Sequence, residues 1–259
     1  MRIYILCDME GTSGIWRPEQ VRPDAPQYAE GRDLLMADVN AAIAGAFDGG
    51  ASEVVVCDTH GGGGHFILER MDPRATFEMP TAISPMPSLD GSFAGLILTG
   101  HHAMAGTLNG FLDHTMDSSR WFCFRINGQP VGEIGMETAY AGHYGVPLLM
   151  VSGDEAACRE AEALCPGIVT AAVKRGLGRN CARCLAPAEA RRLIREGAAQ
   201  AVRTAGERKP WRLEPPIELE LTYYRSDYAD EAAARPGMLR VDARTVRRVV
   251  ESATEVWPV

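Results

Sequence analysis

Carboxylate and imidazole side chains follow apolar, strand-like segments at several points in the first half of the sequence. Asp8 and Glu10 come directly after the apolar run of residues 2–7. Side chains two positions apart on an extended chain point the same way, so both carboxylates are expected to face one point. Two carboxylates held close together repel each other, and a divalent cation between them removes that cost. The pair therefore indicates a metal site, with a solvated surface turn as the alternative.

A second candidate, His60, comes three positions after the apolar run of residues 53–57. The loop continues with four glycines, Gly61 to Gly64, which leave room for a ligand to approach. Asp58 is placed to orient the imidazole from behind. A glycine-rich loop can also cradle phosphate, but the Lys-Ser/Thr pair that completes a P-loop is missing here. We therefore interpret His60 as a candidate metal ligand.

Three further histidines lie around the end of the next strand-like run, residues 94–98. His101 and His102 follow this run directly, and His114 lies twelve positions after His102. Adjacent side chains on a strand diverge, so only one member of the His101–His102 pair is expected to reach a shared site.

Glu133 completes the set, because it follows a short hairpin predicted around Asn127-Gly128 and precedes a helix. The sequence thus presents three carboxylates and two or three histidines, a mixture that suits zinc or manganese. Five ligands exceed one tetrahedral zinc and suit two ions that share a carboxylate. Two ions about 3.5–4 Å apart activate a bridging water and polarise the bond under attack. The predicted chemistry is hydrolysis.

The elements that must position these residues alternate between strand and helix. Apolar residues at four-residue spacing predict a helix over residues 28–47, and Asp154 is expected to cap a helix through Cys165. Continuous apolar runs predict buried strands at residues 2–7, 53–57, 94–98 and 146–151. This pattern predicts an α/β fold, with a mostly parallel sheet flanked by helices.

The last third of the chain looks different. A helix over residues 187–204, an alternating strand at 217–221 and a closing helix over 245–256 are expected there. We predict a catalytic α/β metal-binding domain over residues 1–178 and a smaller C-terminal α+β unit over residues 179–259.

Composition is that of a globular enzyme. Of the 259 residues, 46% are hydrophobic and 23% charged, and the net charge of −8 leaves no basic excess for a nucleic-acid or anionic-membrane partner. The amino terminus lacks the features of a signal peptide, and no apolar run reaches the ~18–20 residues of a membrane span. Seven cysteines, an odd number, fit reduced thiols better than a disulfide framework. We predict a cytoplasmic protein without nucleic-acid or membrane partners.

Taken together, the motifs are specific enough to indicate a family. They are Asp8-Met9-Glu10-Gly11, Asp58-Thr59-His60, Gly100-His101-His102-Ala103, His114-Thr115 and Asn127-Gly128 through Val131-Gly132-Glu133. In order and spacing they resemble the zinc-dependent D-aminopeptidases, bacterial enzymes associated with dipeptide-transport operons. The resemblance covers roughly the whole chain and is firmest over residues 1–175.

The resemblance implies two zinc ions per subunit. The positions that match the family's ligands are Asp8, Glu10, His60, His102 and Glu133, and Asp8 matches the bridging carboxylate. His114 matches the histidine with a catalytic role, nominally as a nucleophile. A role in acid–base chemistry or in stabilising the intermediate is physically easier, because the metals supply the nucleophile and imidazole titrates near neutral pH.

The resemblance also implies the substrate and the assembly. The family cleaves short peptides that carry a D-residue, such as D-alanine, at the amino terminus. Its fold is α/β with a second domain, and it forms a ring-like homo-oligomer, with a decamer as one form, that encloses the active sites.

Two positions depart from the family pattern. Gly61 to Gly64 stand where relatives tend to carry larger polar residues, and the bare loop is expected to widen the substrate pocket. Glu137 stands where asparagine is expected. Its carboxylate is interpreted either as a partner of the substrate's α-ammonium group or as a solvated group.

Other interpretations stay open at this point. A metal-dependent phosphoesterase or amidase would use the same ion pair, although the ligand motifs contain no Arg or Lys to clamp a phosphoryl group. A non-catalytic metal- or peptide-binding protein is the third alternative. His65, His143 and the Cys181-Ala182-Arg183-Cys184 segment are interpreted as structural.

Overall fold

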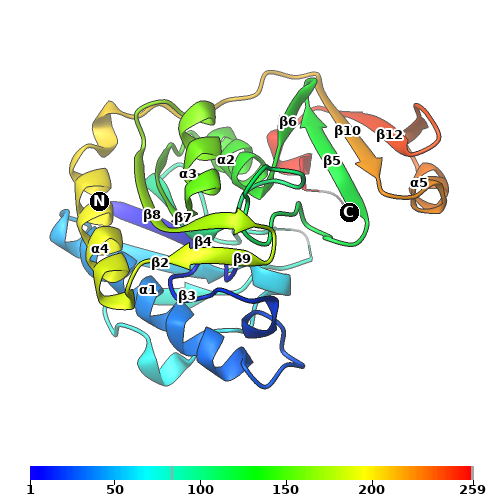
Figure 1. The fold of residues 1–259 in the computed structure, drawn as a ribbon. Coiled ribbons are helices and arrows are strands. Elements are labelled where there is room, and N and C mark those ends of the chain that lie inside the picture. Colours follow the sequence, from blue (N-terminus) through cyan, green and yellow to red (C-terminus); the bar gives the residue numbers. More distant parts are fainter. Residues whose placement is uncertain (83, 258–259) are drawn as a thin grey trace.

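The computed structural model describes residues 1–82 and 84–257 and contains two β-sheets (Figure 1). The larger sheet has seven strands in the order β3-β2-β1-β4-β7-β8-β9. Its strands are β1 (Arg2–Cys7), β2 (Glu53–Asp58), β3 (Thr76–Glu78), β4 (Phe93–His101), β7 (Leu148–Asp154), β8 (Val169–Gly178) and β9 (Cys181–Cys184). Every pairing is parallel except that of β9 with β8. The predicted mostly parallel sheet is confirmed.

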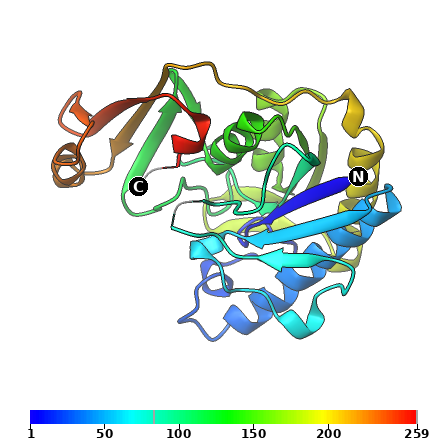
Figure 2. The same cartoon turned by 180° about the vertical axis from the view of Figure 1, so that it is seen from behind.

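Helices cover both faces of this sheet. They are α1 (Tyr28–Asp48) and α4 (Pro187–Arg203) on one face, and α2 (Glu133–His143) and α3 (Glu155–Leu164) on the other. Figure 2 shows β1, β2 and β3 side by side with α1 along their face. Because strand side chains alternate, Ile3 and Ile5 join the core under α1 and α4, whereas Tyr4 and Leu6 join the core under α2 and α3.

The smaller sheet is antiparallel, with the order β11-β12-β10-β5-β6. Its strands are β5 (Trp121–Ile126), β6 (Gln129–Val131), β10 (Ile217–Tyr223), β11 (Leu239–Arg240) and β12 (Thr245–Val250), accompanied by α5 (Ser226–Ala233). Short 3-10 helices are η1 (Pro18–Gln20), η2 (His60–Gly62), η3 (Leu68–Arg70), η4 (Ala205–Glu207) and η5 (Ala253–Glu255). The predicted β5–β6 hairpin is confirmed: Asn127 and Gly128 take the positive φ values, 49° and 79°, that a two-residue turn requires.

The predicted closing helix over residues 245–256 is wrong, because residues 245–250 form strand β12. The apolar positions fit a helical period, but β12 pairs along its length with β10, and Val246 and Val250 turn into the core while Val249 is 58% exposed. The run of β-branched residues favours this extended form, and only η5 after it is helical.

The two sheets do not divide the chain at residue 178. Strands β5 and β6, from the first part of the chain, pair beside β10 in the smaller sheet, so segments far apart in sequence lie side by side (Figure 1). Strand β9 and helix α4, which follow residue 178, belong to the larger sheet. β9 turns back onto β8, and the apolar face of α4 packs against α1.

The chain changes direction in the sheet at β1. Helix α1 leads from β1 to β2 on one side, whereas β4 lies on the other side of β1 and is followed by α2 on the opposite face. A crevice is expected at the carboxyl ends of the strands where such a change occurs.

No helix in the described part of the chain is both long enough and apolar enough to cross a membrane.

Candidate metal centre

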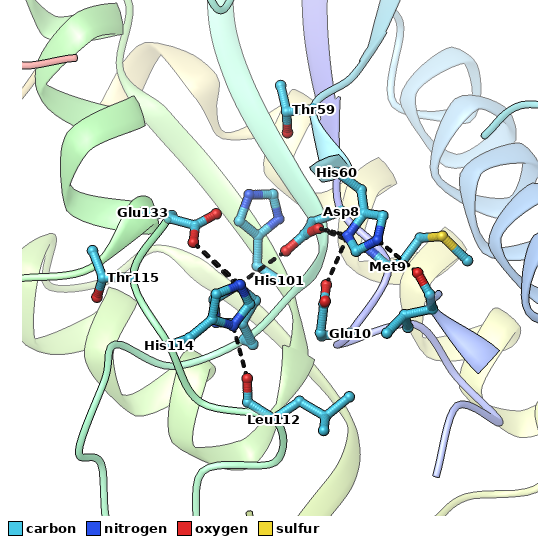
Figure 3. Close-up of polar contacts among 12 residues, drawn as sticks. Asp8, Met9, Glu10, Thr59, His60, His101, Leu112, His114, Thr115 and Glu133 are labelled. Carbon is cyan, nitrogen blue, oxygen red and sulfur yellow. Dashed lines mark hydrogen bonds and ion pairs between the residues drawn. The ribbon is translucent and has the colours of Figure 1, made fainter. Parts of the chain in front are cut away.

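The structure brings all six predicted site residues together at the carboxyl ends of β2, β1 and β4. Asp8 and Glu10 follow β1, His60 begins η2 after β2, and His102 follows β4. Glu133 is the first residue of α2, and His114 lies in the loop between β4 and β5. Figure 3 shows Asp8 between His60 and Glu133, with Glu10 beside His60.

Asp8 lies at the middle of the cluster and uses both carboxylate oxygens. Its Oδ1 is 3.0 Å from Nδ1 of His60, and its Oδ2 is 3.3 Å from Nε2 of His102. Glu10 Oε2 lies 3.0 Å from the same His60 nitrogen. A carboxylate that faces two imidazoles through two different oxygens has the geometry needed to bridge two cations.

The other half of the cluster gathers around Glu133. Its Oε1 is 3.4 Å from Nε2 of His102 and 3.7 Å from Nε2 of His114. The rings of His102 and His114 are stacked, with centroids 3.9 Å apart. Two groups of three candidate ligands result, Asp8-Glu10-His60 and His102-His114-Glu133, and within each group the ligand atoms lie within 4.8 Å of one another.

Backbone carbonyls fix the orientation of each imidazole. Val21 O lies 3.0 Å from His60 Nε2, Ala103 O lies 3.0 Å from His102 Nδ1, and Leu112 O lies 2.9 Å from His114 Nδ1. A carbonyl only accepts, so the facing nitrogen carries the proton and donates. The other nitrogen of each ring, which faces the carboxylates, is then left to bind a cation.

Asp58 does not orient the His60 ring directly, so that prediction is wrong. Its Oδ2 instead accepts a 2.6 Å hydrogen bond from the backbone N–H of His65. The ring of His65 in turn contacts the carbonyl oxygen of His60 at 2.6 Å. Asp58 and His65 therefore hold the loop backbone, which agrees with the structural role predicted for His65. On the side of the His60 ring away from the carboxylates, the partner is the carbonyl oxygen of Val21.

The four glycines after His60 are required by the shape of this loop. Gly61, Gly62, Gly63 and Gly64 have φ values of 51°, 91°, 88° and 102°. Residues other than glycine rarely adopt positive φ values, so four successive glycines allow a tight turn between His60 and His65. Gly62 also lines a cavity of about 330 Å³ beside the cluster, together with Thr59 and Met116.

Another glycine, Gly100, lets β1 and β4 approach closely enough to bring Asp8 near His102. Its φ is 76°, and a Cβ added there would lie 2.0 Å from the carbonyl oxygen of Asp8. The Gly11 N–H donates to Gly100 O at 2.7 Å, which joins the two strand ends. A side chain at position 100 would force the two halves of the cluster apart.

The electrostatics of the cluster favour paired charges. Burial alone would raise the pKa of Asp8, but the imidazoles of His102 and His60 hold it well below its usual range. Burial likewise opposes ionisation of Glu133, yet His102 and His114 lower its pKa to about 2. On His60, burial is outweighed by Glu10 and Asp8, which raise the pKa of the imidazole to about 12. The carboxylates thus stay ionised and attract any cation that reaches them.

Unpaired atoms test whether the residues fit a metal. Asp8 Oδ2, Glu10 Oε2 and His102 Nε2 are buried without a hydrogen-bond partner. Glu10 Oε2 is close to His60 but outside hydrogen-bonding geometry. Leaving such atoms unpaired is costly, and all three belong to one cluster. Carboxylate oxygens and imidazole nitrogens are the ligands that zinc takes. The residues therefore fit a zinc centre.

Comparison with known proteins agrees with this fit. The family model described as D-aminopeptidase matches residues 1–259. The chain belongs to the D-aminopeptidase family. A D-aminopeptidase of Bacillus subtilis (strain 168) is 37% identical over 262 residues, covering 99% of this chain and 94% of that protein. The predicted enzyme class, a metal-dependent hydrolase of peptide bonds, is confirmed at the level of the family.

The fold of this D-aminopeptidase family member is also that of a solved relative. The structure described as the Zn-dependent D-aminopeptidase DppA from Bacillus subtilis, a self-compartmentalizing protease, superposes with a TM-score of 0.95. The two sequences are 34% identical, and the match covers 99% of this chain and 94% of that one.

The departure at Glu137 has a structural explanation. His101 points away from the cluster, as expected for one member of the pair, and its Nε2 lies 2.7 Å from Glu137 Oε2. Both side chains are 1% exposed. Solvation of Glu137 is therefore excluded, and its carboxylate is already engaged by His101 rather than open to a substrate ammonium group.

Sequence reasoning missed the residue that holds the loop after β1. Lys174 on β8 is buried, and its Nζ donates to the carbonyl oxygens of Glu10 at 2.8 Å and Ile15 at 2.7 Å. Burial lowers the pKa of this amine to about 8. A lone lysine within the apolar segment Val169–Lys174 was the available signal.

Asp154, the predicted cap of α3, accepts from Ala157 N at 2.8 Å and also from Phe111 N at 2.9 Å.

Proposed function

We propose that the chain is a dinuclear zinc aminopeptidase that removes an amino-terminal D-residue, such as D-alanine, from short peptides. Membership of the D-aminopeptidase family supports the reaction, and the description of one relative as Zn-dependent supports the metal. The observation that carries the proposal is the position of Asp8, whose two oxygens face His60 and His102 from between the two groups of candidate ligands.

In this proposal Asp8, Glu10 and His60 hold one ion, and Asp8, His102 and Glu133 hold the other. Zinc bound by these residues supplies a Lewis acid that polarises the scissile carbonyl and lowers the pKa of water. The carbonyls of Val21 and Ala103 keep the two ligand imidazoles in the tautomer that presents a free nitrogen.

His114 is proposed to move a proton at Nε2 rather than to bind a metal. Its Nδ1 donates to Leu112 O, its ring is supported by stacking on His102, and its side chain remains 16% exposed in the wall of a second cavity, which Glu10 and His60 also line. An imidazole held in this way can receive a proton and deliver it to the leaving amine. The same placement suits stabilisation of the negative charge that develops on the carbonyl oxygen.

The assembly and location are part of the same proposal. We propose a ring-like homo-oligomer, such as a decamer, which the description of the solved relative as self-compartmentalizing supports. Native mass spectrometry of the intact protein tests this assembly. We also propose a cytoplasmic location, which the seven free cysteines support.

The function is tested by incubating the zinc-loaded protein with matched D-alanyl and L-alanyl di- and tripeptides and following amine release. The proposal predicts hydrolysis of the D-series that depends on zinc. Hydrolysis of the L-series alone would contradict the D-preference while leaving an aminopeptidase. Turnover of p-nitrophenyl phosphate without turnover of either peptide series would favour the phosphoesterase alternative.

A further inference from the structure

A second cavity of about 330 Å³ borders the candidate metal centre on the side of the loop after β1. Glu10, His60 and His114 contribute to its wall, and Arg22 and Arg179 lie in the same wall with Ser118. The volume is at the lower end of the ~300–1,000 Å³ typical of small-molecule sites. The wall of one cavity therefore includes three residues of the candidate metal centre and two arginines, in a chain whose net charge is −8.

Both arginines are tied to the segments that orient the site histidines. Arg22 directly follows Val21, whose carbonyl oxygen contacts the His60 ring. Arg179 accepts a 2.7 Å backbone hydrogen bond from the N–H of Leu112, and the carbonyl oxygen of Leu112 contacts the His114 ring. The backbones that hold the imidazoles thus also hold the two guanidinium groups.

The guanidinium groups are only lightly engaged by protein carboxylates. Arg22 Nε lies 3.6 Å from Asp24 Oδ1, and Arg179 Nε lies 3.7 Å from Asp113 Oδ1. Both closest contacts are made through Nε, which leaves the paired Nη groups for a ligand. The side chains are 56% and 47% exposed, so a bound molecule would cover them.

We propose that Arg22 and Arg179 bind the C-terminal carboxylate of a short peptide whose amino-terminal residue lies at the metal centre. This inference rests on the proposed aminopeptidase function. A peptide of neutral residues carries its negative charge at the C-terminus, and arginine recognises a carboxylate through two parallel N–H donors. We therefore expect short peptides with a free C-terminal carboxylate to be the preferred substrates.

The other cavity beside the cluster serves as a contrast. It is lined by Thr59, Gly62, Met116 and Trp257 together with prolines, and no charged side chain is present among the described residues of its wall. That cavity suits an apolar side chain and offers nothing to a carboxylate. The charge of the peptide therefore determines which cavity receives its C-terminal end.

The test compares D-Ala-D-Ala and D-Ala-D-Ala-D-Ala with their C-terminal carboxamides as substrates of the zinc-loaded protein. We expect kcat/KM to be at least about tenfold higher for the acids, mainly through KM. Arg22→Gln and Arg179→Gln should each reduce this preference by roughly fivefold, the upper range for half-exposed ion pairs. Arg175→Gln is the matched control, because Arg175 is an exposed arginine on β8 that pairs with Glu155 outside the cavity. It should leave the preference unchanged.

Equal rates for acid and carboxamide, or a preference that survives both cavity substitutions, would overturn the inference. If neither form is hydrolysed, the proposed function fails, and calorimetric binding of the same peptides to the zinc-loaded His114→Ala variant tests the arginines separately. There the acid should bind more tightly than the carboxamide, and Arg179→Gln in that background should reduce the difference by roughly fivefold. Equal binding of the two forms would contradict the role of the arginines.

Discussion

His101 on β4 and Glu137 on α2 form a buried ion pair next to the candidate metal centre, with Nε2 and Oε2 2.7 Å apart. Each partner lies next to a candidate ligand: His101 precedes His102, and Glu137 lies one helical turn after Glu133. The pair therefore joins the strand and the helix that carry the two halves of one ligand group.

Replacing Glu137 tests this connection. We expect Glu137→Ala to lower the free energy of unfolding by about 3–5 kcal/mol, because it leaves the buried His101 ring without its partner. Urea unfolding of the zinc-free protein measures the effect. Glu155→Ala, which removes an exposed carboxylate paired with Arg159, is the control and should change stability by less than about 1 kcal/mol. An equally small effect at position 137 would contradict the structural role.

The approach of β1 and β4 can be tested at Gly100. Gly100→Ala places a Cβ 2.0 Å from Asp8 O and imposes a strained φ of 76°. We expect a loss of stability of several kcal/mol and weaker zinc binding, because the strand ends must separate. Gly50→Ala is a matched control: its φ of 103° is also positive, but no atom lies within 4 Å of the added Cβ. The prediction fails if the two variants lose the same stability and bind zinc equally well.

Glu160 on α3 predicts a pH dependence of stability. Its carboxylate accepts from Met104 N at 2.7 Å, and burial raises its pKa to about 7 from 4.5. The folded state therefore holds the proton more tightly than the unfolded state, so stability falls as pH rises from about 4.5 to 7 and stays low above that range. The loss is roughly 3–4 kcal/mol.

Glu160→Gln removes this titration while keeping an acceptor for Met104. Unfolding should be measured with a chelator present, so that zinc binding does not enter. The free energy of unfolding of the variant, relative to the original protein, should rise between pH 4.5 and 7.5. A difference that does not change with pH would show that Glu160 has an ordinary pKa.

The proposed roles of His114 and Glu133 differ in their effect on metal content. His114→Ala should keep both zinc ions and lower kcat for a D-alanyl peptide by about 10²–10⁴-fold. Glu133→Ala should lose zinc as well as activity. Elemental analysis of the desalted proteins separates the two cases. Loss of one zinc from His114→Ala would make this histidine a ligand, which its grouping with His102 and Glu133 allows geometrically.

The strand-end residues could be predicted because parallel strands deliver their carboxyl ends to one edge of the sheet. Asp8, His60 and His102 needed only that rule. The partners of the imidazoles could not be predicted, because Val21 and Leu112 act through backbone carbonyls, which leave no signal in residue type. Arg22 and Arg179 come from loops outside the ligand motifs. The absence of arginine within those motifs therefore did not show that the cavity beside the site lacks arginine.

The smaller sheet could not be predicted from the sequence for a different reason. Thr245–Val250 carries apolar residues at a spacing that suits a helix, and pairing with β10 decides the outcome instead. Strand β5 joins that sheet from more than ninety positions earlier than β10. Local periodicity contains no information on such distant pairing.

A zinc titration tests the central claim most directly. Chelated protein is supplied with increasing zinc, and release of D-alanine from D-Ala-D-Ala is followed together with the zinc bound per subunit. We predict no activity without zinc, and a rate that reaches its plateau when two ions are bound per subunit. A plateau at one ion would contradict the bridging role of Asp8, and a rate independent of zinc would contradict the metal centre itself.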